Sequence, residues 1–276
     1  MATLVAKERF DSMATQDEST YGKEVIGFHS RQLRASLLVE ESRAYWEYLR
    51  LDLPKERRTE VAFEERWFGS KSIARVQLLL GELYHRYDLY PAALEVLIGW
   101  QPRDPIARQN ICHWHLQLSD PTYRQFTGEF FEQRRSQGVL AIDRDIVTRW
   151  LAQEFKPDWA MVTLQRLASS LLTSATSAGL CSAHLGSRTI TYPKVSDEAL
   201  GYWLYLLRHL SYSGSPIDNP YLRSVGLSDV TLEQRVRQLP GFAFSRMSDL
   251  YDFGWQYPDL QAWAAGVLGD GSEVRG

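Results

Sequence analysis

A change of hydrophobic period within residues 143–194 constrains the fold more than any other feature of the sequence. Two helices are predicted first, one capped by Asp143 and a longer one capped by Asp158 that ends at Gly179, because apolar residues recur at steps of three and four. Apolar and polar residues then alternate over Leu180–Leu185 and Arg188–Tyr192, as in strands. Gly186-Ser187 between them fits a two-residue type II′ turn. Helix, turn, helix and hairpin in this order predict a winged helix-turn-helix.

A second helix-turn-helix unit is predicted nearer the N-terminus. Apolar spacing favours a helix over about 31–51, Pro54 can open the next helix, and Gly69 ends it. We expect Ser70 to cap a third helix, because a serine hydroxyl can accept from a free N–H group of the first turn. Its apolar face at helical spacing consists of Ile73, Val76, Leu80, Leu83 and Tyr87.

Prolines mark further helix starts at Pro91, Asp104-Pro105 and Asp120-Pro121. Three more helices are expected over 197–212, 229–239 and 258–268, where aromatic residues form either a core or a partner-docking surface. The sequence therefore predicts a mainly α, multi-helical chain with two helix-turn-helix-like units. Its expected divisions are a flexible arm (1–27), an N-terminal helical domain (28–142), the winged unit (143–194) and an aromatic-rich helical region (195–276).

Composition limits the class of protein. The 276 residues have a formal net charge of −3, so the chain is not a polycation that coats nucleic acid by bulk charge. Two cysteines in separate predicted units cannot build a disulfide framework. We find no signal peptide in the first 24 residues and no membrane span, so a cytoplasmic location is expected.

Catalytic and metal-binding motifs give little support to an enzyme. Phosphate-binding loops, paired C-x-x-C motifs and the common hydrolase motifs are missing from the sequence. Cys112, His113 and His115 stand together, but His113 points away from the other two on a helix, so we expect a buried Cys112 with histidines at the helix flank. No metal and no cofactor are expected.

One acidic pattern has the order of a metal-dependent nuclease site. Asp143 or Asp145 precedes Glu154-Phe155-Lys156, and an acid followed by such a triplet can hold Mg²⁺ through oxygen ligands. A strand usually presents that triplet, whereas this segment has helical spacing. Helix capping and surface charge are the favoured explanation of these residues.

The distribution of charge is more informative than its total. Residues 156–194 contain four basic side chains and one acidic side chain, a net charge of +3, so the rest of the chain has −6. A locally positive winged unit on an acidic chain is typical of a directed nucleic-acid surface. The expected phosphate contacts are Lys156, Arg166 and Arg188, the last at the tip of the wing, together with Ser70, Lys71, Ser72 and Arg75 at a helix N-terminus.

The layout from about Phe28 to Ala183 resembles the BrxA family of BREX phage-resistance systems. The resemblance rests on Leu38–Ser42, Gly69–Arg75, the aromatic helix Tyr123–Gln137, and Trp159–Ala178 followed by Gly179-Leu180. It implies a non-enzymatic DNA-binding accessory protein that works beside the ATPase, methyltransferase and phosphatase-like members of such a system. This sequence differs from the family in having Ala74 between Ile73 and Arg75, and in a longer tail after residue 195.

Three functions follow in order of preference. The first is binding of double-stranded DNA, mainly through phosphate, in company with other BREX proteins. The second is a protein–protein adaptor that docks larger defence subunits without touching DNA. The third is a metal-dependent nuclease that uses Asp145, Glu154 and Lys156.

Overall fold

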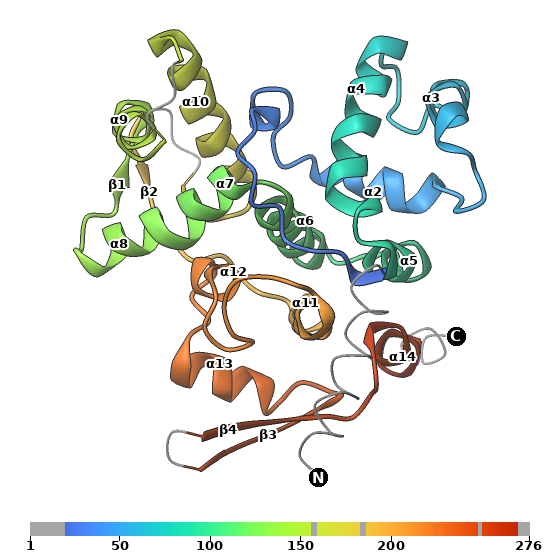
Figure 1. The fold of residues 1–276 in the computed structure, drawn as a ribbon, viewed down its shortest axis with the longest axis vertical. Helices are drawn as coiled ribbons and strands as arrows, with labels where there is room; N and C mark the ends of the chain where they lie inside the picture. The colour runs from blue at the N-terminus through green and yellow to red at the C-terminus, as the bar shows by residue number, and fades with distance from the viewer. Residues whose placement is uncertain (1–19, 156–158, 183–185, 248–249, 270–276) are drawn as a thin grey trace, which may run out of the picture.

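The computed structural model describes residues 20–155, 159–182, 186–247 and 250–269 (Figure 1). Over these ranges the chain is mainly helical with two small antiparallel strand pairs, as the sequence predicts for its fold class. The α-helices are α2 (Val39–Tyr48), α3 (Lys55–Glu64), α4 (Ile73–Leu83), α5 (Pro91–Trp100), α6 (Pro105–Ser119), α7 (Pro121–Gln125), α8 (Phe131–Ser136), α9 (Arg144–Glu154), α10 (Met161–Ser177), α11 (Asp197–His209), α12 (Pro220–Ser224), α13 (Asp229–Val236) and α14 (Leu260–Trp263). The strands are β1 (Ala141–Ile142), β2 (Arg188–Thr189), β3 (Phe242–Met247) and β4 (Leu250–Trp255), and the shorter helical turns are η1 (Arg31–Leu33), η2 (Tyr84–Asp88), η3 (Phe126–Phe130) and η4 (Ala264–Leu268).

Helix starts agree closely with the local signals in the sequence. Prolines occupy the first turns of α5, α6 and α7, where the missing N–H group costs nothing. Asp104 accepts hydrogen bonds from two first-turn N–H groups of α6, and Asp120 and Asp143 each accept one at the start of α7 and α9. These predicted helix starts are confirmed.

Helix α6 lies at the centre of the molecule (Figure 1). It packs against α2, α7, α11 and η2, so it joins regions that are far apart along the chain. Trp114 of α6 stacks on Trp203 of α11 with ring centroids 5.3 Å apart, and both side chains are fully buried. One continuous hydrophobic core therefore joins the N-terminal helices to the aromatic C-terminal region, whose Tyr202, Trp203, Tyr205 and Trp263 are core residues.

The chain between α8 and α11 forms a small antiparallel sheet. β1 pairs with β2, with Ile142 opposite Arg188, and an isolated bridge joins Cys181 to Ile190. The expected pairing of the segment after Gly179 with the segment after Ser187 is therefore present among the described residues. Gly179 and Gly186 have φ of +73° and +92°, the left-handed region that glycine tolerates best. The turn type predicted for Gly186 also depends on residue 185, which lies outside the described residues.

Three expectations about local structure are wrong. The helix expected over 31–51 spans only Val39–Tyr48, because Leu38 has φ of 57° and a right-handed helix cannot continue through that conformation. Ser72, not Ser70, caps α4, and Ile73 is 53% exposed rather than part of the buried face. The region after residue 195 is not wholly helical, since β3 and β4 pair in register from Phe242↔Trp255 to Met247↔Leu250.

The described helices include none that is long and apolar enough to cross a lipid bilayer.

Candidate nucleic-acid interface

The N-terminal end of α4 has the features of an anion site. The Ser72 hydroxyl accepts from the Arg75 backbone N–H at 3.4 Å, and the first turn has no acidic residue. Ser70 and Ser72 are exposed. Lys71 is half-buried, and its Nζ lies 3.8 Å from Glu41 Oε1, so part of its charge is already neutralised. The free N–H groups and the helix dipole favour a phosphate at this end.

Arg75 joins α4 to the segment that precedes α2. Its guanidinium Nη1 donates to the backbone carbonyl of Arg34 at 3.4 Å. About three helical turns further along, in η2, Arg86 donates to the carbonyls of Ser36 and Leu37 at 2.6 Å each. The segment is thereby held against α4 by charged donors, while the Arg34 side chain stays exposed.

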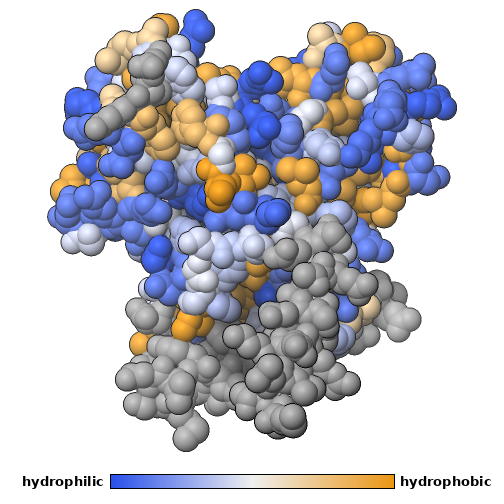
Figure 2. Space-filling model, in the orientation of Figure 1, coloured by the Kyte–Doolittle hydropathy of each residue, from blue (hydrophilic) through white to orange (hydrophobic). Residues whose placement is uncertain are grey.

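The same segment is also held by α10. Gln32 of η1 donates from Nε2 to Ser174 Oγ at 2.5 Å, and the Ser170 hydroxyl donates to the Gln32 carbonyl. Figure 1 shows α4 and α10 rising to the upper edge of the view, their N-terminal ends outermost, with the η1 segment between them. In Figure 2 the two helix ends form separate lobes with a notch between them. Five of the seven predicted residues therefore belong to one edge, which we call the α4–α10 edge: Ser70, Lys71, Ser72 and Arg75 at the α4 end and Arg166 on α10.

Helix α10 presents its N-terminus without a side-chain cap. The residue before the helix is Ala160, and the first turn contains no acidic residue, so the first N–H groups have no carboxylate or hydroxyl partner from this turn. The expected cap, Asp158, lies outside the described residues. Arg166 is exposed and makes no ion pair with any described residue.

Arg188 is less accessible than the sequence predicts. It begins β2, two residues after Gly186 and opposite Ile142, and its side chain is half-buried, with Nε enclosed and without a hydrogen-bond partner among the described residues. The pairing of β2 with β1 therefore covers part of a side chain that was expected to be free at the tip of the wing. Lys156 lies outside the described residues.

Two arginines in and beside η1, between the two lobes, were not predicted as part of the site. Arg31 is half-buried and Arg34 is exposed, and neither forms an ion pair within the described ranges. They lie near the buried carboxyl of Glu82, whose pKa is raised by burial and is partly lowered by Arg86, Arg31 and Arg34. Their spacing was consistent with the outer face of a long amphipathic helix, which gave no signal of a shared edge.

Apolar side chains are also exposed on this edge. Ile73 in the first turn of α4 is 53% exposed, and Met161 and Val162 in the first turn of α10 are 59% and 56% exposed. Such residues can contact thymine methyl groups, but they also fit an apolar protein surface.

The Cys-His cluster of α6 is a structural core. His113 is hydrogen-bonded from Nδ1 to the Tyr123 hydroxyl at 3.0 Å and from Nε2 to Ser224 Oγ at 2.9 Å. His115 bonds similarly to the Arg86 carbonyl at 2.9 Å and the Tyr202 hydroxyl at 2.7 Å. Both rings are buried, so their expected place at the helix flank is wrong, whereas burial of Cys112 is confirmed.

Burial also sets the protonation of this cluster. It lowers the pKa of His113 to about 3 and that of His115 to about 4, and it raises the pKa of the Cys112 thiol. Neutral rings with both nitrogens in use have no lone pair to offer a metal. Among the described residues, no group of three His, Cys, Asp or Glu side chains is placed to hold a metal ion.

The acids of the nuclease pattern lie far apart along one helix. Asp145 and Glu154 are at opposite ends of α9, nine positions apart, which is about 13.5 Å along the axis. Two oxygen ligands of one Mg²⁺ ion must lie within about 4 Å of each other. Asp143 is engaged as the cap of α9, with its Oδ1 2.8 Å from the Ile146 N–H group.

Comparison with known proteins adds no family. No protein-family model matches the chain, and no curated protein matches it.

Proposed function

We propose that this protein is a non-enzymatic DNA-binding protein that holds duplex DNA by its phosphates along the α4–α10 edge. The single observation that supports it most is that two helix N-termini, one capped by a serine and one without a side-chain cap, lie on one edge with arginines that have no ion-pair partner among the described residues. Arg34, Arg75 and Arg166 supply the charge, Arg31 and Lys71 add to it, and Ser70 and Ser72 can donate hydroxyls to phosphate oxygens.

We further propose that the winged helix-turn-helix predicted over residues 143–194 is completed on its N-terminal side by α7, α8 and β1. The order of helix (α7 to α8), β1, α9, α10 and the two short strands joined through Gly186 agrees with that motif. In such a unit α10 is the recognition helix. With Arg166 as its exposed cation and serine and threonine elsewhere on the outer face, it would read phosphate more than base edges.

The resemblance to the BrxA family makes the function more specific. We propose an accessory protein of a BREX phage-resistance system, acting in the cytoplasm with other BREX proteins as partners. The net charge of +3 over residues 156–194 and the absence of a nuclease-like arrangement of Asp145 and Glu154 both support a binding role.

A second candidate function is the protein–protein adaptor. The exposed Ile73, Met161 and Val162 favour it, because three apolar side chains at two helix starts fit an apolar partner as well as DNA. In this case the same edge would dock a larger defence subunit.

Fluorescence anisotropy with a labelled duplex of about 30 base pairs tests the first candidate. If four phosphates are contacted, raising the salt from about 50 mM to about 200 mM should weaken binding by about 150-fold, since the slope is about 0.9 per contact. No binding at the lower salt, or binding that does not respond to salt, would contradict the proposal and favour the adaptor.

A further inference from the structure

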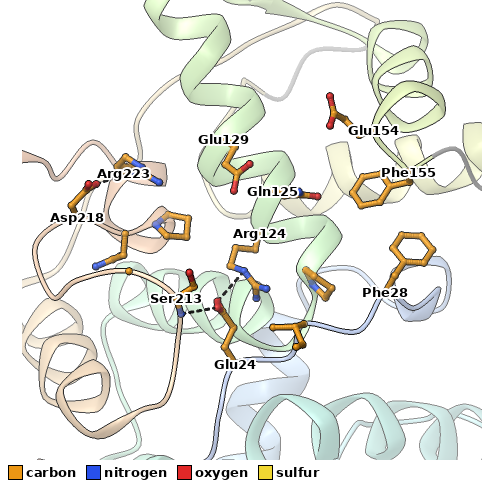
Figure 3. Close-up of a pocket in the computed structure, with 15 residues that line it drawn as sticks. Glu24, Phe28, Arg124, Gln125, Glu129, Glu154, Phe155, Ser213, Asp218 and Arg223 are labelled. Carbon is orange, nitrogen blue, oxygen red and sulfur yellow. Dashed lines mark hydrogen bonds and ion pairs between the residues drawn. The ribbon is translucent and has the colours of Figure 1, made fainter.

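A second concave surface is formed by residues that the DNA proposal does not use. It is a groove of about 690 Å³ between the N-terminal segment, the α7–η3 helix, the end of α9 and the loop before α12 (Figure 3). A volume of this size is ample for a few side chains of a bound polypeptide.

The floor of the groove is electrically neutral. Glu24 Oε1 lies 3.2 Å from Arg124 Nε and also accepts from the Tyr221 hydroxyl at 3.0 Å. Arg124 donates further to the carbonyls of Gln117 and Val25 at 2.7 and 2.9 Å. These two charges are therefore committed to holding the N-terminal segment in place.

The rim has excess negative charge. Arg223 is paired with Asp218 at 2.6 Å, which leaves Glu129 on η3 and Glu154 at the end of α9 as exposed carboxylates without an ion pair to any described residue. Figure 3 shows them on two neighbouring helices on the same side of the groove. They repel phosphate, so nucleic acid does not fit this surface.

One wall of the groove is apolar and exposed. Ile26 is 84% exposed and Phe28 is 43% exposed, although the Phe28 ring packs on Phe155 with centroids 5.1 Å apart. Pro121 and Pro220 complete the lining. An aliphatic side chain with this exposure gains free energy when a partner covers it.

We propose that this groove docks a basic, apolar-containing segment of a partner protein. An arginine or lysine of that segment pairs with Glu129 and Glu154, and a neighbouring large apolar residue covers Ile26 and the edge of Phe28. A simple polyamine would satisfy the carboxylates but not the apolar wall. The charge complementarity and the apolar wall together specify a polypeptide.

The test uses the full chain and three fluorescein-labelled peptides, one alternating Arg and Leu, one alternating Glu and Leu, and one alternating Arg and Ser. The Arg/Leu peptide should bind most tightly. Glu129→Gln with Glu154→Gln should weaken it about fivefold or more, since each substitution removes one exposed ion pair with the peptide. Ile26→Ser should weaken the Arg/Leu peptide about fivefold and leave the Arg/Ser peptide unchanged.

A matched control removes two carboxylates elsewhere. Glu64 and Glu95 are exposed and make no ion pair with a described residue, so Glu64→Gln with Glu95→Gln changes the net charge equally. It should alter Arg/Leu binding less than twofold. Equal weakening by both pairs of substitutions, equal binding of the Glu/Leu peptide, or no effect of Ile26→Ser would overturn the proposal. The groove variants should leave the salt dependence of duplex binding unchanged, so this test and the DNA test can fail separately.

Discussion

The Cys-His cluster of α6 and the α4–α10 edge contain the residue types most often found in functional sites, and their environments are opposite. In α6, His113 and His115 are buried and each ring nitrogen has a partner. At the edge, Arg34 and Arg166 are exposed and make no ion pair with described residues. Satisfied polar groups in a core stabilise a fold, whereas unpaired charges at exposed helix ends are available to a ligand.

The residue types in a short stretch of sequence are therefore a weaker guide to a functional site than the tertiary contacts that those residues make. The C-H-W-H run looks like a ligand set in the sequence, yet each histidine bonds to residues distant along the chain, such as Ser224 and Tyr202. The edge has no compact motif, because Gln32 and Arg34 join α10 and α4 through hydrogen bonds that span up to 142 positions.

Substitution of a buried histidine of α6 should change stability the most. His115→Ala should lower the free energy of unfolding by about 3 kcal/mol, because it opens a cavity and leaves the Tyr202 hydroxyl without its partner. Urea unfolding followed by circular dichroism measures it, with His85→Ala, at a half-buried position, as the control that should cost less than about 1 kcal/mol. Equal costs at the two sites would contradict the assignment of His115 to the core.

The next largest effect is expected in the pH dependence of the free energy of unfolding. The pKa values of His113 and His115 fall to about 3 and 4 in the folded chain, below the unfolded value of about 6.5. Between these values only the unfolded chain binds the protons, so stability falls as the pH falls below about 6.5. From pH 7 to pH 5.5 the two rings together should lower the free energy of unfolding by about 2.5 kcal/mol.

His115→Gln isolates one ring from the other titrating groups. Its loss of stability over the same pH range should be smaller than that of the wild type by about 1.2 kcal/mol. Identical pH dependence in the two proteins would show that His115 titrates normally and is not enclosed.

A smaller effect is expected at Gly186, which precedes β2. Gly186 has φ of +92° with open space around its Cβ position, so Gly186→Ala should cost about 1 kcal/mol through backbone strain alone. Gly99 in α5 also has open space but a helical backbone, and Gly99→Ala should stabilise by up to about 1 kcal/mol. In thermal unfolding, Gly186→Ala should lower Tm and Gly99→Ala should raise it. Changes of Tm in the same direction would show that Gly186 is not held at positive φ.

Local signals in the sequence predicted the helix starts because each depends on a few neighbouring residues. Asp104-Pro105 and Asp120-Pro121 combine a cap with a fixed proline φ, and both helices begin there. Strands β3 and β4 were not predicted, because Phe242 pairs with Trp255 across the hairpin and its aromatic residues suit a helix core or a strand equally well.

The α4 half of the candidate interface could be predicted from the sequence, because it also depends on neighbouring residues. Ser72 and Arg75 follow a glycine and open an amphipathic helix, which is a local pattern. Arg34 joins them only through tertiary contacts, since Arg75 reaches its carbonyl from 41 positions away. The half-buried state of Arg188 was not predicted, because the pairing of β2 with β1, rather than the hairpin alone, determines its surroundings.

The most direct test of the DNA-binding edge is the slope of log K against log salt for a labelled duplex. Arg75→Gln with Arg166→Gln removes one cation from each lobe, and Arg103→Gln with Arg237→Gln removes the same charge from exposed positions off the edge. The edge variant should reduce the slope by about 1.8, which is 0.9 for each lost phosphate contact, and the control should leave it unchanged. Equal slopes in the wild type and the edge variant, or an equal reduction in the control, would contradict DNA binding by this edge.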